Sequence, residues 1–217
     1  MPNIQKLKEE QMKLAAKILT SNQLEEVKFI GGVDVAYTPS EVIGVVIVMD
    51  AKTGKLVDKA FSVKKQDMPY IPGFLFYREA PAIIEAFGKL KQKPDLLFVP
   101  ANGILHPRRI GLASHLGLVL DTPTIGVAKK LLCGELQDKK VILDKEVRAT
   151  EISTKSYAKP VYLSPGHRIS LKTAQKWFMD LLRGHKLPEP LKLAHRFSTS
   201  IKKKEIKNVS QSSFPKP

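Results

Sequence analysis

The sequence has only one cysteine, Cys133, among its 217 residues. A single cysteine excludes an intramolecular disulfide and is typical of proteins that work in a reducing compartment. No run of about 18 apolar residues occurs, so no membrane-spanning helix is predicted. The amino-terminal segment is rich in lysine and lacks the apolar core of a secretory signal. We therefore expect a cytoplasmic protein without a membrane partner.

The motifs of several common enzyme classes are also missing. The sequence has no Cys/His spacing of the kind that binds structural zinc. It contains neither a glycine-rich phosphate loop ending in Gly-Lys-Ser/Thr nor the Gly-x-Ser-x-Gly turn of many hydrolases. These absences argue against a zinc module, a nucleoside triphosphatase of the common type and a serine hydrolase.

Acidic residues are few in comparison with basic ones. The 36 lysines and arginines outnumber the 21 aspartates and glutamates, which gives a net charge of +15 and an isoelectric point near 9.8. Such an excess favours a polyanionic partner, because neutralising phosphates releases their condensed counterions. A merely lysine-rich surface is the alternative. Nucleic acid is favoured over a membrane surface, because no basic amphipathic helix with an aromatic apolar face is evident.

The spacing of apolar residues predicts one α/β domain over residues 1–198. An amphipathic helix at 3–20 precedes β-branched strands at 29–37, 42–49 and 56–63. A helix at about 82–90, a short buried strand at 96–99, a helix at 110–120 and a strand at 124–127 follow. Three antiparallel strands followed by parallel strands, flanked by helices, is the order of a ribonuclease H-like core, although other α/β folds share this pattern.

The last third of the chain continues with strands and ends in a polar segment. Strands are predicted at 141–143, 147–152 and 160–163, a helix at 171–183 and a short last helix near 191–196. Residues 199–217 are rich in lysine, serine and glutamine without an apolar period, so we predict a basic, disordered tail.

Asp34 lies in the middle of the first predicted strand, with its side chain on the face opposite to its neighbouring valines. A carboxylate in a core strand has to be paired or to hold a metal, because its burial alone costs several kcal/mol. A solvent-facing aspartate on an edge strand is the alternative. Gly31 and Gly32, just before it, favour a site that a ligand can approach closely. Glu79 falls near the start of a helix and can face Asp34.

Pro69, Tyr70, Ile71 and Pro72 form a loop with an aromatic residue between two prolines, and Gly73 ends it. The prolines restrict the backbone on either side of the tyrosine. A stiffened aromatic tip can enter a nucleic-acid groove and unstack bases with little cost in ordering. The alternative is a loop that simply packs against the protein.

Two groups of cations follow neighbouring predicted strands. His106, Arg108 and Arg109 come shortly after the strand at 96–99, and Lys129 and Lys130 come directly after the strand at 124–127. The carboxyl ends of parallel strands meet at one edge of a sheet, where α/β proteins usually bind ligands. Each group alone is typical of a solvated surface, but together they favour a phosphate-binding floor.

Taken in chain order, these motifs resemble those of the endonuclease V family of inosine-directed repair nucleases. The matching segments cover about residues 1–197 and are residues 32–37, 68–74, 78–81, 93–95, 106–108, 111–117, 123–130, 164–168 and 187–190. The resemblance implies a ribonuclease H-like fold and Mg²⁺- or Mn²⁺-dependent hydrolysis. The implied substrate is DNA, with RNA as the alternative, that contains deoxyinosine or inosine. The implied cut lies at the second phosphodiester 3′ to the deaminated adenine, and a monomer is expected.

The resemblance also implies roles for individual residues. The implied metal ligands are Asp34, Glu79 and His195, which with Lys129 make up the catalytic set. Residues 69–72 would form the wedge that separates strands, with Tyr70 at its tip. The implied pocket for the flipped base contains Gly73, Leu75, Ala101 and Gly103. The phosphate-binding set is His106, Arg108, Arg109 and Lys130.

The chain departs from the family at one important place. The family's fourth strand ends Val-Asp-Gly-(His/Asn)-Gly, whereas residues 99–103 read Val-Pro-Ala-Asn-Gly. Pro100 thus stands in the place of a catalytic aspartate, and Ala101 in the place of a pocket glycine. Asp95 should point to the opposite face of the strand, and Asn102 carries no charge. Losing one of two anionic ligands should weaken metal binding and misplace the attacking water, at a cost of orders of magnitude in rate.

Three functions therefore stay open. The first is an endonuclease V-type nuclease, active through a rearranged site. The second is a catalytically silent relative that binds inosine-containing or branched nucleic acid. The third is a basic RNA-binding structural protein without a lesion pocket. Nicking of an inosine-containing duplex separates the first two, and an inosine preference in binding separates both from the third.

Overall fold

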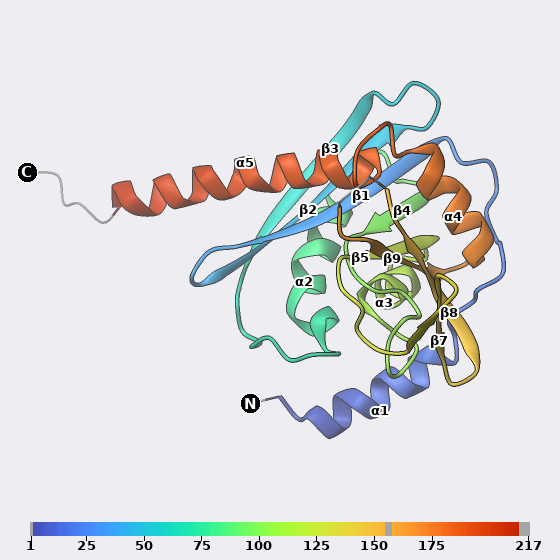
Figure 1. The fold of residues 1–217 in the computed structure, drawn as a ribbon. Coiled ribbons are helices and arrows are strands. Elements are labelled where there is room, and N and C mark those ends of the chain that lie inside the picture. Colours follow the sequence, from blue (N-terminus) through green and yellow to red (C-terminus); the bar gives the residue numbers. More distant parts are fainter. Residues whose placement is uncertain (1, 155–157, 213–217) are drawn as a thin grey trace, which may run out of the picture.

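One sheet runs through the protein. The computed structural model describes residues 2–154 and 158–212, with side chains up to residue 206. Its strands are β1 (Phe29–Tyr37), β2 (Glu41–Asp50), β3 (Leu56–Lys65), β4 (Leu96–Val99), β5 (Thr124–Ala128), β6 (Glu135–Gln137), β7 (Lys140–Leu143), β8 (Glu146–Ile152) and β9 (Val161–His167). In this described part the sheet has the order β3-β2-β1-β4-β5-β9-β8-β7-β6 (Figure 1).

The strand directions agree with the prediction from the sequence. β1, β2 and β3 pair in antiparallel fashion, whereas β1, β4 and β5 are parallel neighbours. The remaining pairs are antiparallel. The predicted α/β class, with three antiparallel strands followed by parallel ones in a ribonuclease H-like core, is therefore confirmed.

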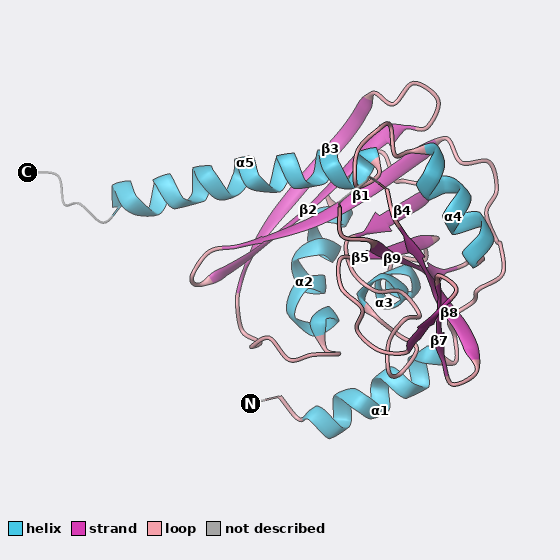
Figure 2. Ribbon diagram, viewed as in Figure 1, coloured by secondary structure: helices cyan, strands magenta, loops and turns pink. Residues whose placement is uncertain are grey.

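Helices cover both faces of the sheet (Figure 2). On one face, α2 (Leu75–Gly88) and α3 (Leu112–Val119) share a core with β1 and β4 that includes Val33, Ile83 and Leu116. On the other face, α4 (Leu171–Asp180) and α5 (Glu189–Ser212) pack Phe178 and Leu191 against the strands. The first helix, α1 (Ile4–Ala15), lies beside the loop that follows β4. No helix in the described part of the chain is long and apolar enough to cross a membrane.

The last helix is much longer than the sequence pattern predicts. α5 runs to Ser212, so residues 199–212 are helical and not the disordered tail that composition suggests; residues 213–217 lie outside the described residues. The physical reason is a buried stripe at helical spacing, Leu191, Ala194, Ser198 and Ile201, that packs against the sheet. Because Ser198 is polar, it interrupts the apolar period and hides the continuation of the helix.

Candidate active site

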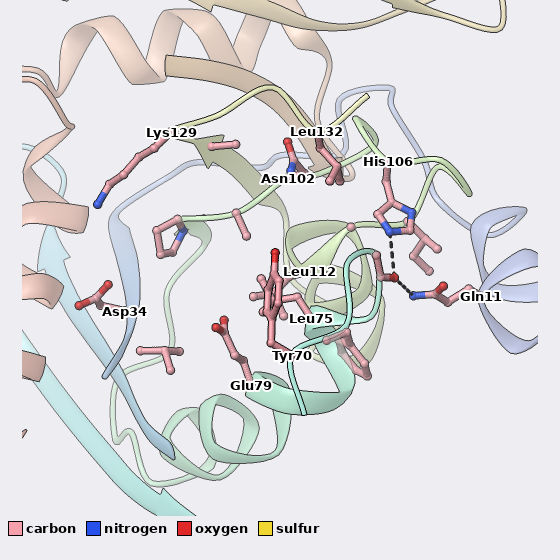
Figure 3. A pocket seen from close by; sticks show the side chains of 18 residues that line it. Gln11, Asp34, Tyr70, Leu75, Glu79, Asn102, His106, Leu112, Lys129 and Leu132 are labelled. Carbon is pink, nitrogen blue, oxygen red and sulfur yellow. Dashed lines mark hydrogen bonds between the residues drawn. The ribbon is translucent and has the colours of Figure 1, made fainter. Parts of the chain in front are cut away.

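A cavity of about 300 Å³ opens where β1, β4 and β5 end, beside α2 and the loop at 69–73. The predicted site residues that line it are Asp34, Tyr70, Gly73, Leu75, Glu79, Ala101, His106 and Lys129. In Figure 3, Asp34 and Lys129 border one end, His106 and Gln11 lie at the other, and Tyr70 stands between them. The topology thus gathers residues that are up to 121 positions apart, from Gln11 to Leu132, around one space.

The two predicted carboxylates border the same cavity from different elements. Asp34 comes from β1, and Glu79 lies one helical turn after Leu75 on the same face of α2. Burial raises the pKa of Glu79 to about 7; the hydrogen bond from Tyr37 lowers it, and the charge of Asp34 raises it further. The Tyr37 hydroxyl donates to Glu79 Oε1. The Glu79 carboxyl is therefore partly protonated near neutral pH. A nearby cation would favour its ionised form.

Pro100 follows the end of β4 and borders the same cavity as Asp34. The last paired residues of β1 and β4 are Gly32 and Phe98, and both Asp34 and Pro100 lie two residues beyond this pair. Pro100 lines the cavity, but its side chain offers no oxygen or nitrogen as a ligand. Asp95 cannot replace it, because its Oδ2 accepts hydrogen bonds of 2.9 and 2.8 Å from backbone N–H groups at the start of β1.

The first turns of α5 hold Asp34 from the side. Asp34 Oδ2 lies 3.0 Å from His195 Nδ1 and accepts a hydrogen bond of 2.5 Å from the Ser198 hydroxyl. α5 reaches this position because β1 has a glycine beneath it: a Cβ on Gly32 would lie 2.1 Å from the carbonyl oxygen of Pro190. His195 is thereby brought to Asp34 but is not among the residues that line the cavity.

The room beside Gly31 and Gly32 is used by the protein itself. A Cβ on Gly31 would lie 2.6 Å from Leu97 Cδ1, and Gly32 is covered by α5. The expectation that these glycines let a ligand approach Asp34 is therefore wrong. They allow β4 and α5 to pack closely against β1 instead. Their effect on the site is indirect, through the position of α5 beside Asp34.

The donor set suits a hard divalent cation only in part. Asp34 and Glu79 supply carboxylate oxygens at one cavity, which such cations prefer. Within the residues that the structure describes, no group of three or more His, Cys, Asp or Glu side chains is arranged to hold a metal. Asn102 Oδ1 is buried without a hydrogen-bond partner in the described structure, but Figure 3 places Asn102 away from Asp34. The carboxylates of Asp34 and Glu79 are thus the candidate metal ligands. Pro100, which also lines the cavity, supplies no ligand atom from its side chain.

The tip of the predicted wedge is exposed. Tyr70 keeps 64% of its surface accessible and lines the cavity, while Pro69, Ile71 and Pro72 surround it without lining the cavity. An exposed aromatic residue on a proline-restricted loop is poorly explained by packing alone. Its position beside the cavity fits contact with a ligand.

Three donors anchor the end of this loop. The carbonyl oxygen of Gly73 accepts from Gln11 Nε2 at 3.1 Å, from His106 Nε2 at 3.0 Å and from Arg108 Nη2 at 2.9 Å. Arg108 Nε also donates to Gln11 Oε1 at 2.5 Å. Gly73 has a φ of +79°, where a side chain would be strained and would crowd Arg108. Arg78 Nη1 donates to the carbonyl oxygen of Met68 at 3.0 Å, so the loop is held at both ends and has an exposed tip at Tyr70.

His106 takes part in this anchor as a neutral ring. Burial, aided by the charge of Arg108, lowers the pKa of His106 to about 4. Its Nε2–H faces the Gly73 carbonyl, and its Nδ1 accepts the backbone N–H of Arg108 at 3.2 Å. A neutral, buried imidazole is a poor phosphate ligand at neutral pH.

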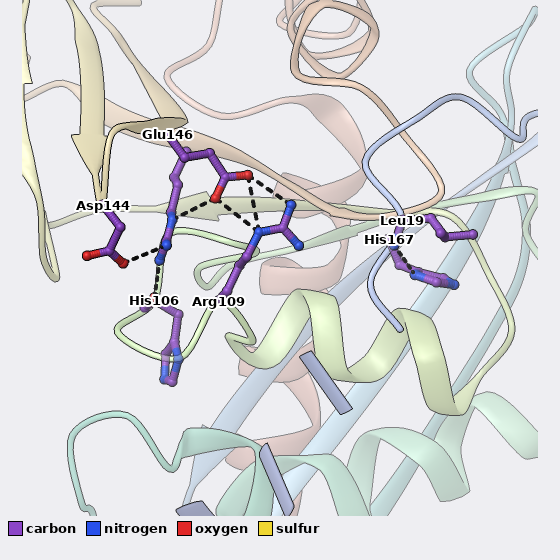
Figure 4. A network of polar contacts seen from close by, with 7 residues as sticks. Leu19, His106, Arg109, Asp144, Glu146 and His167 are labelled. Carbon is purple, nitrogen blue, oxygen red and sulfur yellow. Dashed lines mark hydrogen bonds and ion pairs between the residues drawn. The ribbon is translucent and has the colours of Figure 1, made fainter. Parts of the chain in front are cut away.

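Arg109, in the loop at 106–109, takes part in a network of polar contacts (Figure 4). Its Nε and Nη2 donate to the Glu146 carboxylate at 2.8–3.1 Å. The buried Arg148 joins Glu146, Asp144 and the carbonyl oxygen of His106. This network connects the loop at 106–109 to the β7–β8 hairpin. The guanidinium group of Arg109 is thereby paired with the Glu146 carboxylate.

The predicted phosphate-binding residues thus differ in whether their side chains already have partners within the protein. His106, Arg108 and Arg109 have partners within the chain. Lys129 and Lys130 are exposed at the end of β5, and Lys129 lines the cavity. We therefore expect phosphate contacts at the two lysines more than at the other three residues.

Three of the four residues predicted for the base pocket line the cavity. Gly73, Leu75 and Ala101 line the cavity, whereas Gly103 does not. A Cβ on Gly103 would lie 1.9 Å from the carbonyl oxygen of Pro165, so this glycine serves close packing between the loop after β4 and β9.

The polar residues Gln11, Tyr37 and Ser198 bond to predicted site residues but were not themselves predicted. Gln11 occupies an apolar position of the amphipathic pattern in α1, and Ser198 occupies one in α5, three residues after His195. A polar residue at an apolar position was the available signal in both cases. Tyr37 ends β1 and gave no such signal.

Comparison with known proteins adds independent evidence. Residues 12–196 match the family model described as Endonuclease V. A curated endonuclease V from Dictyoglomus thermophilum is 39% identical over 205 residues, which cover 91% of this chain and 90% of that protein. One from Gloeobacter violaceus is 42% identical over 210 residues, covering 90% and 85%.

Solved structures agree with the sequence comparison. The crystal structure of endonuclease V from Bacillus subtilis is similar with a TM-score of 0.88 and 31% identity, covering 96% of this chain and 95% of that one. Endonuclease V from Ciona intestinalis, solved with a 24mer DNA containing an inosine followed by a ribo-adenosine, has a TM-score of 0.81 and 28% identity. The coverage is 95% of this chain and 98% of that one.

Proposed function

This chain belongs to the endonuclease V family, and from that premise we propose that it recognises deaminated adenine in nucleic acid and hydrolyses the second phosphodiester on the 3′ side. The substrate class is DNA that contains deoxyinosine, with inosine-containing RNA as the alternative. The Ciona intestinalis relative, bound to inosine-containing DNA, supports this choice.

One observation carries the proposal. A single cavity of about 300 Å³ is lined by two carboxylates, Asp34 and Glu79, by the exposed Tyr70 and by Lys129. Its volume lies at the small end of the range for ligand pockets, which suits one flipped base more than a whole nucleotide strand. The carboxylates stand at the end where the backbone of that nucleotide would leave the pocket.

Each residue then has a defined task. Tyr70 fills the gap left in the base stack, and Gly73, Leu75 and Ala101 surround the flipped base. Lys129 contacts the phosphate. His195 uses Nδ1–H toward Asp34, which orients the Asp34 carboxylate and leaves its own Nε2 as a proton acceptor.

Asp34 and Glu79 would hold a divalent cation, Mg²⁺ or Mn²⁺. The buried Glu79 supports this proposal, because burial raises its pKa to about 7 and the charge of Asp34 raises it further, although the Tyr37 hydroxyl and Arg78 lower it. A bound cation would neutralise the charge that develops on the attacked phosphate. Pro100 adds no ligand, so binding of this cation is weak.

A second candidate function follows from Pro100. If two carboxylates do not hold the cation at physiological concentration, the chain binds inosine-containing nucleic acid without cutting it. The wedge, the pocket and the lysines are independent of the metal, so recognition would persist.

The deciding test uses duplexes that are identical except for one deoxyinosine or one adenine. Nicking is measured with Mg²⁺ and with Mn²⁺, and binding by fluorescence anisotropy in EDTA. Inosine-dependent nicking that is lost in Asp34→Asn supports the nuclease. An inosine preference in binding without nicking supports the second candidate. Equal nicking and equal binding of the inosine and adenine duplexes would contradict both.

A further inference from the structure

Exposed cations lie along α5 and beside a groove on its β2–β3 side, whereas the cavity lies toward β4 and β5. Arg196 and Ser200 border a groove of about 280 Å³ between α5 and the strands β2 and β3, together with Lys59 and Phe197. Helical spacing puts Lys203 seven residues after Arg196, hence on the same face. Arg196, Lys203 and the adjacent Lys204 are exposed, as is Lys59 on β3. We name Lys59, Arg196, Lys203 and Lys204 the α5 cation track.

We propose that the α5 cation track binds the backbone phosphates of the substrate on one side of the scissile bond. The proposal rests on the proposed function, since it extends the path of the same nucleic acid. Continuity supports it: His195, which contacts Asp34, immediately precedes Arg196 on the helix. The side chains of consecutive helical residues project about 100° apart, so a backbone that passes Asp34 at His195 has to cross over α5 to reach Arg196.

The dimensions of the track suit a nucleic-acid backbone. Eight residues separate Arg196 from Lys204, which corresponds to about 12 Å of helix. A strand of B-DNA advances about 3.4 Å per phosphate, so the track spans roughly three phosphates. Figure 1 shows the C-terminal end of α5 extending beyond the sheet.

The groove strengthens this attraction. Its walls include Ile47, Leu56 and Leu193, and the Phe197 ring lies under the Lys59 ammonium at 4.9 Å. A cluster of cations beside apolar walls focuses the electrostatic field and attracts an anionic chain more strongly than scattered surface lysines do. An acidic protein segment would also feel this field, but it has no reason to continue into the cavity at Asp34.

The test compares two triple variants that remove the same charge. The first is Arg196→Gln, Lys203→Gln, Lys204→Gln. The control is Lys139→Gln, Lys140→Gln, Lys145→Gln, three exposed lysines at the two ends of β7, on the opposite edge of the sheet from β3. Binding to inosine and adenine duplexes is measured by anisotropy across a series of salt concentrations.

We expect the slope of log K against log salt to fall by about 2 to 3 in the track variant, because each lost phosphate contact removes roughly 0.9. The control should lose less than about 1. Affinity for inosine and adenine duplexes should fall by the same factor, since backbone contacts carry no base information. Equal slopes for the two variants would overturn the proposal.

Neutral linkages then locate the contact. Methylphosphonates placed singly along the strand should weaken wild-type binding at about three neighbouring positions and leave the track variant unaffected there. Sensitivity that is identical in both proteins would also overturn the proposal. If wild type shows no inosine preference at all, the proposed function fails, whereas the slope comparison still decides whether α5 contacts phosphate.

Discussion

Gly32 lies so close beneath Pro190 that a Cβ at this position would stand 2.1 Å from the Pro190 carbonyl oxygen. This contact sets the approach of α5 to β1, and therefore the position of His195 and Ser198 at Asp34. A backbone contact on the core side of the strand thus controls the geometry of a carboxylate at the cavity.

Gly32→Ala should push α5 away from β1. We expect a loss of about 1–3 kcal/mol in the free energy of unfolding, as for other overpacked positions, and a larger proportional loss of nicking. Urea unfolding and the nicking assay measure the two effects. Gly88→Ala is the matched control, because nothing lies within 4 Å of a Cβ there. A Gly32→Ala protein with normal stability and activity would contradict this account of α5.

Gln11→Leu should loosen the loop that carries Tyr70. The change removes the amide that bridges the Gly73 carbonyl and Arg108, so we expect the inosine preference in binding to fall about tenfold, equivalent to roughly 1.4 kcal/mol. Gln5→Leu is the control, since Gln5 lies on the same helix but bonds to Glu9 at the surface. If thermal stability falls while the inosine preference stays, Gln11 is only structural.

Tyr70→Ala should weaken binding without weakening the fold. Because Tyr70 is 64% exposed, its removal should leave the unfolding midpoint unchanged. Loss of stacking on bases should cost about 1–3 kcal/mol of binding free energy, and Tyr70→Phe should restore it. Equal affinity of the alanine variant and wild type for the inosine duplex would rule out the wedge.

The sequence was sufficient for those parts of the site that depend on strand order. Asp34 and Glu79 carry charge in positions where the pattern predicts a core strand and a helix, so their meeting followed from topology. The importance of Pro100 followed from the resemblance, because it stands where the fourth strand of the family ends in an aspartate.

The parts that depend on side-chain pairing were beyond the sequence. Nothing in the pattern shows that Arg109 is held by Glu146, 37 residues later, or that Gly103 is pressed against Pro165. Gln11 and Ser198 interrupt apolar stripes, and the pattern alone cannot separate a tolerated polar residue from one with a buried partner. These contacts are set by packing between elements that are distant in the chain.

Acid should destabilise the protein through its buried histidines. Burial, with a smaller effect of His106, lowers the pKa of His115 to about 4, whereas an unfolded histidine titrates near 6.5. Between these values the unfolded chain binds more protons, so the contribution to stability is complete above about pH 6.5 and is lost as the pH falls toward 4.

His115→Phe should remove part of this pH dependence. The phenyl ring can keep the stacking on Phe76, whose ring centroid lies 3.4 Å away, but it cannot take up a proton. Urea unfolding at pH 7 and pH 5 should show a smaller difference for the variant than for wild type, by on the order of 1 kcal/mol. An unchanged difference would mean that His115 is not one of the groups that titrate on unfolding.

Introducing a carboxylate at position 100 is the sharpest test of the site. Pro100→Asp with Ala101→Gly should place a carboxylate beside Asp34 and open the pocket toward the base. We expect inosine-dependent nicking at least about tenfold above the parent, which needs only roughly 1.4 kcal/mol of barrier reduction. Mg²⁺ or Mn²⁺ should also raise the melting temperature of the double variant, because it binds the folded state, and should raise that of the parent little.

The uncharged pair Pro100→Asn with Ala101→Gly separates charge from backbone effects. It removes the same proline and the same methyl group but supplies no anion, so it should show neither the gain in nicking nor the metal-dependent melting temperature. If the asparagine variant gains as much as the aspartate variant, release of the proline ring and not a metal ligand is responsible. If neither variant differs from the parent, Pro100 does not disable the site, and the two carboxylates Asp34 and Glu79 already suffice or another defect limits the reaction.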